Sequence, residues 1–248
     1  MELSDHKILI TGGSSGIGLG LARAFIDGGN AVAICGRSEN RLADAKEALG
    51  NVHTLRCDLA EPADVAALPR QAVEALGGLT ILVNNAGVQK NYVFGEAMPA
   101  DVARDAAWEI EVNLTSLISL TGACLPILES SESAAIVNVS SALAITPKKS
   151  APVYCATKAG VHSFTQALRY QLEDTQPHIK VFELMPPLVD TPMTAGRHRG
   201  DLTPADVAGE TLKAMTRDRL EIQVGKTKLL SVAMRIAPPV ARKILRNT

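Results

Sequence analysis

Short apolar runs rich in isoleucine and valine recur along the chain, separated by stretches of mixed polarity. Several of these runs alternate too little between apolar and polar residues to belong to a sheet with one face in water. Such runs are typical of parallel strands that are buried on both faces. The predicted strands are residues 7–11, 31–35, 51–57, 79–85, 134–140, 179–184 and 221–225.

The stretches between the predicted strands carry apolar residues at helical spacing. One of them begins with Thr203 and Pro204, a capping residue followed by proline at the first helical position. The predicted helices are residues 16–28, 39–49, 62–76, 99–129, 152–175 and 203–217. Regular alternation of strand and helix is typical of an α/β fold with a doubly wound parallel sheet and helices on both faces. We expect a single domain over residues 1–248.

Composition narrows the function classes. The 248 residues carry a formal net charge of −1 with both signs mixed, which argues against nucleic acid and favours a small-molecule partner. The apolar run at the N-terminus is too short for a signal peptide and no other run predicts a membrane span, so we expect a cytoplasmic protein. The four cysteines form no CxxC pair and no cluster with histidine, which indicates reduced packing residues and no metal site. They are Cys35, Cys57, Cys124 and Cys155.

A glycine-rich loop, TGGSSGIG, follows the first predicted strand and leads into the first predicted helix. Its glycines let the backbone approach a pyrophosphate closely, and the start of the helix supplies unpaired N–H groups and a favourable dipole. The alternative is a purely structural turn, but the strand before the loop and the helix after it favour dinucleotide binding. The candidate phosphate-binding residues are Gly12, Ser14, Ser15, Gly16, Ile17 and Gly18.

The spacing TGxxxGxG resembles that of the classical short-chain dehydrogenase/reductase family, and the resemblance covers roughly residues 5 to 192. Further marks of the family occur in the right order along the chain. They are Asp58 after the third predicted strand, NNAG at residues 84–87 after the fourth, and then Asn113, Ser141, Tyr154 and Lys158. The resemblance implies a Rossmann-type fold that binds a nicotinamide dinucleotide.

The resemblance also implies which residues hold the cofactor. Asp58 corresponds to a carboxylate that accepts from the adenine amino group, although it also suits the cap of the helix that follows. Asn84 corresponds to an asparagine that ties neighbouring strands together. The implied cofactor residues are Gly12, Ser14, Ser15, Gly16, Ile17, Gly18, Arg37, Asp58, Leu59, Asn85, Ala86, Gly87, Tyr154, Lys158, Pro186, Val189 and Thr191.

The end of the second predicted strand, AVAICGR, bears on which dinucleotide binds. An acidic residue there binds both ribose hydroxyls and favours NAD(H), but this chain has Gly36 followed by Arg37. An arginine holds a phosphate through two parallel hydrogen bonds, so we expect NADP(H), with NAD(H) as the second choice. The alternatives for Arg37 are a solvated loop residue and a residue that stacks on adenine.

Tyr154 and Lys158 lie four residues apart in VYCATKAG, so a helix places them on one face. Reduction of a carbonyl needs a proton donor at its oxygen. A tyrosine hydroxyl has a pKa near ~10, and a lysine cation beside it lowers that pKa. The resemblance implies this role for the pair, with Lys158 also bonded to the nicotinamide ribose, and its lysine spacing favours C=O over C=C reduction. The alternative is an ordinary exposed pair on an amphipathic helix.

Ser141 ends the fifth predicted strand, thirteen residues before Tyr154, as the family pattern requires. The resemblance implies that its hydroxyl orients the substrate oxygen, and the spacing favours it over its rival Ser140. Asn113 matches the family asparagine that interrupts its helix and holds a water connected to the lysine. A structural role at a helix kink is the alternative for Asn113.

The chain departs from the family pattern after the sixth predicted strand, where Pro186 and Pro187 replace the usual Pro-Gly. The second proline fixes φ and removes an N–H group, so this turn must adapt. The Val189 N–H group and the Thr191 hydroxyl remain candidates for binding the nicotinamide carboxamide. Residues 193–201 occupy the position of the family's substrate lid, where two arginines and a histidine either meet an anionic substrate or stay solvated.

The segment 226–248 stands where many family members have a glycine-rich strand at a tetramer interface. Its apolar and basic residues predict an atypical amphipathic helix, divided at Pro238 and Pro239, that packs on the core or on another subunit, with a membrane surface as the third alternative. In the family, helices that correspond to residues 99–129 and 152–175 form a dimer. We therefore expect a homodimer rather than a tetramer.

These observations together predict an NADP(H)-dependent oxidoreductase that interconverts a small-molecule carbonyl and a primary or secondary alcohol. The alternative is a non-catalytic NADP(H)-binding sensor or scaffold protein. The complete set of Asn113, Ser141, Tyr154 and Lys158 argues against that alternative, because a binding module does not need all four residues.

Overall fold

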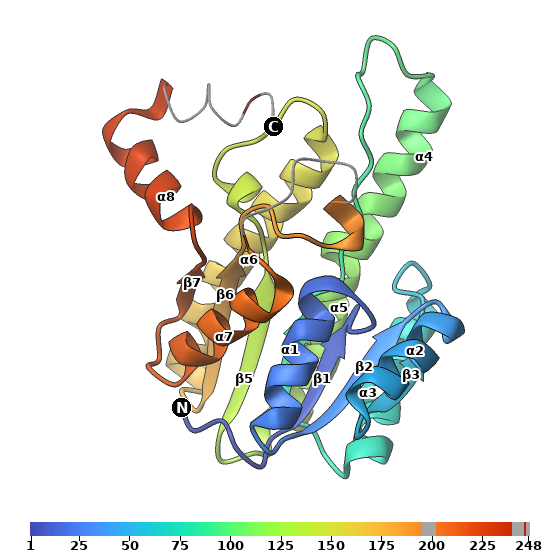
Figure 1. The fold of residues 1–248 in the computed structure, drawn as a ribbon, viewed down its shortest axis with the longest axis vertical. Helices are drawn as coiled ribbons and strands as arrows, with labels where there is room; N and C mark the ends of the chain where they lie inside the picture. Colours follow the sequence, from blue (N-terminus) through green and yellow to red (C-terminus); the bar gives the residue numbers. More distant parts are fainter. Residues whose placement is uncertain (195–201, 240–245, 247–248) are drawn as a thin grey trace.

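A computed structural model describes residues 1–194, 202–239 and 246 of the chain. Within these residues, parallel strands form a seven-stranded sheet in the order β3-β2-β1-β4-β5-β6-β7 (Figure 1). The strands are β1 (Lys7–Thr11), β2 (Ala31–Gly36), β3 (His53–Arg56), β4 (Ile81–Asn84), β5 (Ala134–Val139), β6 (Ile179–Met185) and β7 (Glu221–Gln223). The predicted doubly wound parallel sheet is confirmed, and the strand ends differ from the prediction by no more than two residues.

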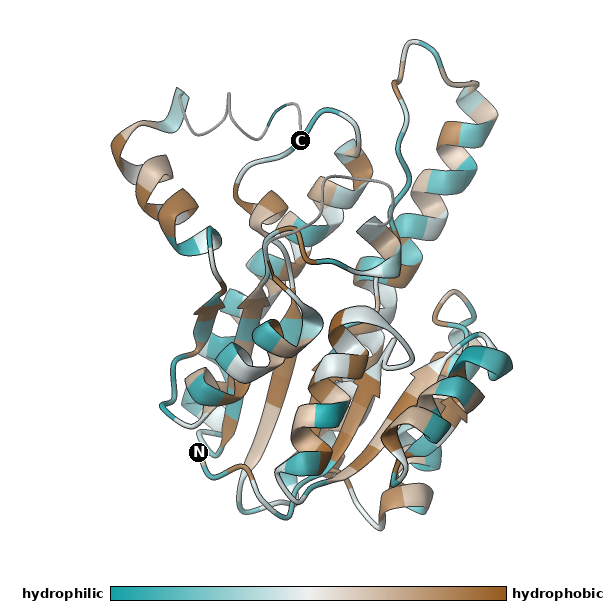
Figure 2. Cartoon of the chain, in the orientation of Figure 1, coloured by the Kyte–Doolittle hydropathy of each residue, from teal (hydrophilic) through white to brown (hydrophobic). Residues whose placement is uncertain are grey.

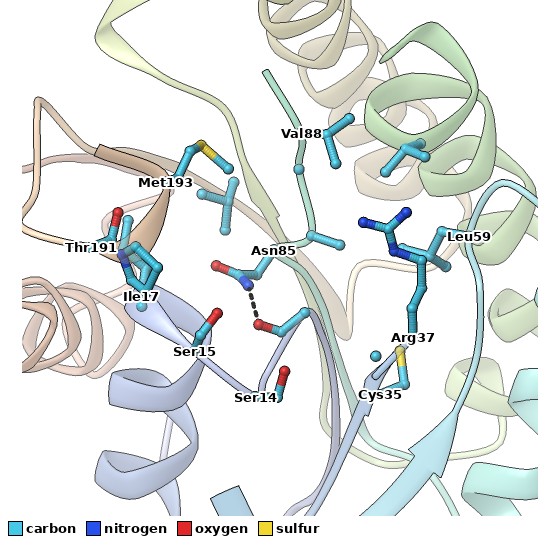
Figure 3. Close-up of a pocket in the computed structure, with 18 of the residues that line it drawn as sticks. Ser14, Ser15, Ile17, Cys35, Arg37, Leu59, Asn85, Val88, Thr191 and Met193 are labelled. Carbon is cyan, nitrogen blue, oxygen red and sulfur yellow. Dashed lines mark hydrogen bonds between the residues drawn. The ribbon is translucent and has the colours of Figure 1, made fainter. Parts of the chain in front are cut away.

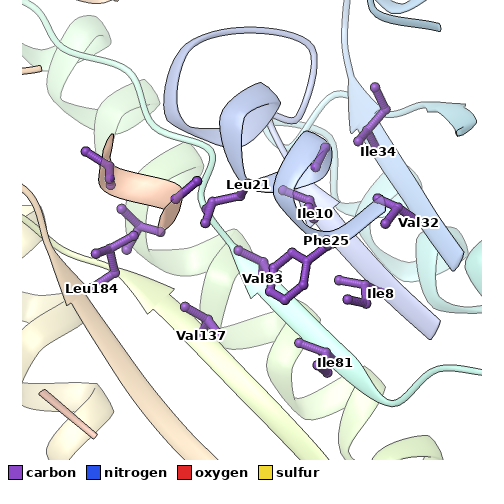
Figure 4. Close-up of a cluster of buried hydrophobic side chains, with 14 of the residues drawn as sticks. Ile8, Ile10, Leu21, Phe25, Val32, Ile34, Ile81, Val83, Val137 and Leu184 are labelled. Carbon is purple, nitrogen blue, oxygen red and sulfur yellow. The ribbon is translucent and has the colours of Figure 1, made fainter. Parts of the chain in front are cut away.

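The helices cover both faces of the sheet, as predicted (Figure 1). They are α1 (Gly16–Asp27), α2 (Glu39–Leu49), α3 (Pro62–Leu76), α4 (Pro99–Ile110), α5 (Ser116–Glu129), α6 (Pro152–Thr175), α7 (Pro204–Met215) and α8 (Thr227–Ile236). On one face, buried apolar residues of α1, α2 and α7 pack on the sheet. Figure 4 shows Leu21 and Phe25 of α1 against the strands. On the other face, those of α3, α5 and α6 do the same. The central strands β4 and β5 are buried at every position and mostly apolar, which is why they lack alternation (Figure 2).

The order of the strands reverses at β1. The chain moves from β1 through β2 to β3 on one side, and then crosses to β4 on the other side of β1. Because the strands are parallel, their carboxyl ends share one edge of the sheet. The loops after β1 and β4 therefore diverge at this edge and leave a crevice, the place where doubly wound sheets bind ligands.

The predicted helix over residues 99–129 is present but contains a π-helical turn, η1 (Glu111–Thr115), between α4 and α5. The run Pro99–Glu129 is long and apolar enough, by length and composition alone, to cross a membrane. In the fold, Leu120, Cys124 and Leu128 of α5 are fully buried in the apolar layer with α3 and the sheet. This burial identifies α5 as a core helix of the fold.

The described residues after β6 include the helices α7 and α8. Thr203 caps α7 in a reciprocal capping box with Asp206, as the Thr-Pro pair predicted. Helix α8 follows β7, and its Leu229, Val232 and Ile236 side chains are exposed, so they do not pack on the core of this chain. We expected this segment to pack on the core or on another subunit. These three side chains do not pack on the core, and packing on another subunit stays a prediction. Residues 195–201 of the predicted lid lie outside the described residues.

Candidate active site

The cleft at the carboxyl edge of the sheet is lined by the loops after β1 to β4, the end of β5, helix α6 and the turn after β6 (Figure 3). Most of the residues predicted from the sequence line it together. They are Gly12, Ser14, Ser15, Gly16, Ile17, Arg37, Asp58, Leu59, Asn85, Ala86, Gly87, Tyr154, Lys158, Pro186 and Thr191. Four predicted residues, all of which the structure describes, do not line the cleft: Gly18, Asn113, Ser141 and Val189.

The glycine loop is as tightly packed as a phosphate-binding turn requires. Gly12 has φ +64°, and a Cβ atom there would lie 3.0 Å from the Cα of Ala86. Gly18 does not line the cleft. A Cβ atom on it would lie 2.4 Å from the Gly12 carbonyl oxygen, so this glycine lets α1 pack closely against the loop. Helix α1 begins at Gly16, and this start of the helix lines the cleft. Ser14 and Ser15 line the cleft beside it (Figure 3), and the Ser15 hydroxyl makes no capping bond to the helix.

Arg37 and Arg41 line the cleft together with Gly36, at the end of the cleft beside β2. No acidic residue ends β2, because its last residue is Gly36. The Arg37 guanidinium carbon lies 5.5 Å from the ring centroid of Trp108 on α4, a cation–π contact that orients the arginine across the cleft. The sequence reasoning missed both Arg41 and Trp108. Arg41 lies in the first turn of α2, which starts two residues after Arg37, and this short separation along the chain was the signal for the first.

Asp58 stabilises the turn that follows β3. Its Oδ1 accepts a hydrogen bond from the Ala60 N–H at 3.0 Å, and its own N–H donates to Asp64 Oδ2. The alternative prediction, that Asp58 caps the helix that follows, is wrong, because the cap residue of α3 is Glu61, three residues later. Asp58 and Leu59 both remain on the wall of the cleft.

The two asparagines at the end of β4 have different partners. Asn84 Nδ2 donates to Thr121 Oγ1 at 3.0 Å and to Asn138 Oδ1 at 2.9 Å, so this asparagine joins β4 to β5, the strand-tying role that the resemblance implied. Asn85 Nδ2 instead donates to the carbonyl oxygens of Thr11 and Gly12 (Figure 3). This side chain therefore fixes the loop after β4 against the glycine loop.

Tyr154 and Lys158 project from the first two turns of α6 into the cleft, with the lysine Nζ 5.8 Å from the tyrosine ring centroid. Lys158 is almost completely buried and donates to the Val139 carbonyl oxygen at 2.8 Å. Burial lowers the pKa of Lys158 from 10.5 to about 8, because a charged ammonium group is poorly solvated there. Lys158 still carries its charge at neutral pH and supplies a cation beside Tyr154.

Asn113 lies in the π-helical turn η1, behind the wall of the cleft. Its Oδ1 accepts from the Val88 N–H at 2.7 Å, and its Nδ2 donates to the Val88 carbonyl oxygen and to Thr157 Oγ1. A Cβ atom on Gly87 would lie 3.6 Å from Asn113 Oδ1 and 3.5 Å from Lys158 Nζ, so the asparagine and the lysine flank the same glycine. The amide thus fastens the loop after β4 to α6, beside the lysine.

The two serines at the end of β5 point to different partners. Ser141 Oγ accepts from the Leu143 N–H at 3.1 Å and begins a short 3-10 helix. Ser140 is the serine that lines the cleft, and its hydroxyl donates to the buried carboxylate of Glu183. The role of Ser141 stays a prediction, and the partnership of Ser140 with a buried glutamate on β6 was not predicted from the sequence.

The turn after β6 closes the other end of the cleft. Pro186 lines it and accepts a hydrogen bond from the Ala142 N–H, while Thr191 contributes its side chain. The Thr191 N–H donates to Thr194 Oγ1 at 3.0 Å. Val189 is buried and pairs in a bridge with Leu202, so its side chain supports the turn from behind.

The cleft also contains residues that were not among the predicted site residues. They are Cys35, Gly36, Arg41, Cys57, Val88, Val112, Val139, Ser140, Pro192 and Met193. All four cysteines of the chain are buried free thiols, and burial raises the pKa of Cys124 to about 12. Among the described residues, no group of three or more His, Cys, Asp or Glu side chains is placed to hold a metal ion.

These features fit a nicotinamide dinucleotide. A glycine turn without room for side chains, a helix start, serine hydroxyls and two arginines line one part of the cleft, while a tyrosine and a buried lysine line another. A pyrophosphate suits the first group of residues. A reacting carbonyl or alcohol suits the second.

Comparison with known proteins gives consistent results. A sequence model of the short chain dehydrogenase family matches residues 6–201. The uncharacterized oxidoreductase DltE of Bacillus subtilis is 44% identical over 211 residues, which cover 85% of this chain and 82% of the relative. The uncharacterized oxidoreductase SSP0419 of Staphylococcus saprophyticus is 34% identical over 225 residues, 87% of this chain and 93% of the relative.

Solved structures are similar over nearly the whole chain. A short chain dehydrogenase/reductase from Burkholderia phymatum in complex with NAD has a TM-score of 0.87 at 26% identity, covering 100% of this chain and 97% of the other. A 3-ketoacyl-(acyl-carrier-protein) reductase from Brucella melitensis complexed with NADH has a TM-score of 0.80 at 27% identity, covering 91% and 99%.

Proposed function

Because the chain belongs to the short-chain dehydrogenase family and is an oxidoreductase of that family, we propose that it interconverts a carbonyl and a primary or secondary alcohol, with NADP(H) as its preferred cofactor. The observation that carries this proposal is the pair of Tyr154 and Lys158 in the cleft, with the lysine buried and held by the Val139 carbonyl. A buried cation beside a tyrosine hydroxyl is an acid–base device.

The chain's own residues provide the proton chemistry. When bound, the nicotinamide group supplies the hydride for reduction or accepts it in oxidation. Tyr154 donates its hydroxyl proton to the substrate oxygen during reduction and takes it back during oxidation. The Lys158 ammonium stabilises the phenolate that remains. We assign the orienting of the substrate oxygen to Ser141 because of its spacing from Tyr154, although Ser140 beside it is the serine on the cleft wall. Asn113, behind the cleft wall, holds the loop after β4 and α6 in place beside the lysine, and we assign it the proton relay.

The preference for NADP(H) rests on the residues at the end of β2. Gly36 offers no carboxylate to the ribose hydroxyls, and Arg37 and Arg41 both line the cleft there. Trp108 holds the Arg37 guanidinium in place before a ligand arrives, which lowers the entropy that a phosphate contact would cost. Two arginines in one turn of chain suit a 2′-phosphate.

Substitution of Tyr154 by phenylalanine tests the reaction. Tyr154→Phe keeps the ring and removes the proton donor, so we expect turnover of the best substrate in a panel of ketones and aldehydes to fall by at least ~100-fold. NADPH affinity, measured by isothermal titration, should stay within a factor of about three. Unchanged turnover would refute the assignment of Tyr154, and NADPH binding without turnover on the whole panel would favour the sensor alternative.

Substitution of Arg37 tests the cofactor preference. Arg37→Ala should weaken NADPH binding by about 10- to 100-fold, the loss of a charged hydrogen bond, and leave NADH binding nearly unchanged. Arg23→Ala is a matched control, since Arg23 lies on α1 and bonds the Ala48 carbonyl away from the cleft. Equal losses for both dinucleotides would contradict a role in 2′-phosphate recognition.

We also propose a cytoplasmic homodimer. Exposed apolar side chains on α5 and α6, such as Ile118 and Tyr170, support an interface between two copies of these helices. The buried free thiols are consistent with a reducing compartment. Sedimentation equilibrium of the purified protein separates a dimer from a monomer or a tetramer, and cell fractionation tests the compartment.

A further inference from the structure

A buried carboxylate lies directly behind the catalytic end of β5. Glu183, in the middle of β6, has a completely buried side chain. Its Oε1 accepts a hydrogen bond of 2.5 Å from Ser140, and its two oxygens lie 3.0 and 2.9 Å from Nδ1 of His162. An ionised carboxylate is costly to bury unless it is paired and hydrogen-bonded, and these contacts satisfy Glu183.

The three residues connect the protein surface to the cleft. The His162 side chain is 31% exposed, Glu183 is fully buried, and Ser140 lines the cleft. His162 lies on α6, one turn after Lys158, so the two side chains leave the same face of that helix. None of the assigned steps of the reaction uses His162 or Glu183.

Lys158 and His162 of α6 act on two successive residues at the end of β5. Lys158 donates to the carbonyl oxygen of Val139, and Glu183 holds the hydroxyl of the next residue, Ser140. The Val139–Ser140 peptide is held by Lys158 at its carbonyl oxygen and by the Leu184 carbonyl at its N–H, while His162 acts through Glu183 on the side chain of Ser140. A shift of this peptide would move the partner of the Lys158 ammonium group.

We propose that His162 and Glu183 are positioning residues, which hold Ser140 and the Val139–Ser140 peptide against Lys158, and that protonation of His162 strengthens this hold. The inference rests on the proposed function in one respect, since it assigns Lys158 to the reaction. It adds a titrating group that acts on the site from outside the cleft.

The surroundings of His162 set the direction of the effect. The hydrogen bond to Glu183 raises the pKa of His162, burial opposes this, and the charges of Glu183 and Glu221 on β7 raise the pKa further while Arg169 on α6 lowers it. Gln166 contacts the other ring nitrogen. Because the folded pKa is raised, the stabilising pair is fully present below the ordinary histidine pKa of 6.5 and is lost as pH rises through the raised value.

The test compares the protonation of His162 with the rate of the enzyme. NMR titration of the imidazole Cε1–H signals between about pH 5.5 and 9 gives the midpoint of His162, whose signal is the one missing from His162→Gln. In the unsubstituted enzyme, we expect kcat for reduction to fall about fivefold as pH rises through this midpoint, a coupling at the lower end of those found between linked sites. The other titrating groups are present in the unsubstituted enzyme and in the variants alike, so their effects on kcat cancel in the comparison.

Two variants separate positioning from a merely structural role. His162→Gln keeps a hydrogen-bond donor that does not titrate, so its kcat should lack the step. Ser140→Ala keeps the His162–Glu183 pair and its NMR titration but cuts the link to the cleft, so its kcat should lack the step as well. Glu183→Gln should move the NMR midpoint of His162 down towards 6.5, which checks the pair itself even in a weakened protein.

The proposal is overturned if kcat of the unsubstituted enzyme shows no step at the His162 midpoint, or if Ser140→Ala still follows that midpoint. Should no substrate in the panel be turned over, the proposed function has failed, and the same comparison is made on the NADPH dissociation constant, because Lys158 lines the cleft. A step in that constant that Ser140→Ala abolishes supports the inference. Its absence from the unsubstituted protein overturns it.

Discussion

Burial of the Lys158 ammonium group lowers the free energy of unfolding of the protein, and the size of this loss can be measured. The ammonium group is buried and has one protein acceptor among the described contacts, the Val139 carbonyl oxygen. Replacement by methionine keeps much of the side-chain volume and removes the charge. We expect Lys158→Met to lose turnover and, at the same time, to change how stability depends on pH.

The size of the effect follows from the pKa of Lys158. Burial lowers it from 10.5 to about 8, and this difference corresponds to a free energy on the order of 3 kcal/mol. Between these two values the unfolded chain binds more protons at this lysine than the folded chain does. The penalty is therefore fully present below about pH 8 and is relieved as pH rises towards 10.5, so this lysine makes stability increase with pH in that window.

Urea unfolding, followed by the fluorescence of the single tryptophan, gives the free energy of unfolding of both proteins from pH 7 to 10.5. The unsubstituted protein should gain about 3 kcal/mol relative to Lys158→Met over this range, because titrations common to both proteins cancel. The Val139 carbonyl loses its donor in the variant, which shifts the two curves by a constant amount. Parallel curves across the whole range would show that the lysine is not desolvated and would refute the reasoning.

Three further substitutions have expected outcomes. Gly12→Ala places a Cβ atom 3.0 Å from the Ala86 Cα at φ +64°, so isothermal titration should show at least ~10-fold weaker NADPH binding and thermal unfolding a lower Tm. Thr203→Ala removes the capping box of α7 and should cost about 1 kcal/mol in urea unfolding while NADPH binding stays unchanged. Leu229→Gln on α8 should change the free energy of unfolding by less than about 0.5 kcal/mol, because the side chain is 72% exposed. A larger loss there would reveal a packed partner for α8.

The order of strands and helices was predictable because it depends on local patterns. Buried parallel strands appear as apolar runs, helices as apolar residues at helical spacing, and α7 begins at its Thr-Pro signal. The glycine loop was predictable for a similar reason, since close approach and positive φ at Gly12 leave few alternatives to glycine.

The identity of partners between distant elements was not predictable from the same patterns. The family spacing selects Ser141, whose role stays a prediction, but it gives no sign that the neighbouring Ser140 bonds the buried Glu183 of β6. Arg37 was recognised as a cation near the cofactor, yet its contact with Trp108 depends on where α4 lies relative to the loop after β2. In the same way, the apolar residues of α8 predicted packing on the core or on another subunit, and the structure shows three of them exposed.

By itself, the sequence determined the fold class, the glycine turn and the placement of Tyr154 and Lys158 on one helix face, because each of these is encoded within a few consecutive turns or strands. Only the tertiary structure decided that β5, α6 and β6 bring Ser140, His162 and Glu183 together. Such contacts depend on the register and packing angle of elements that are separated along the chain. A buried charge shows its importance only when the groups that satisfy it are known.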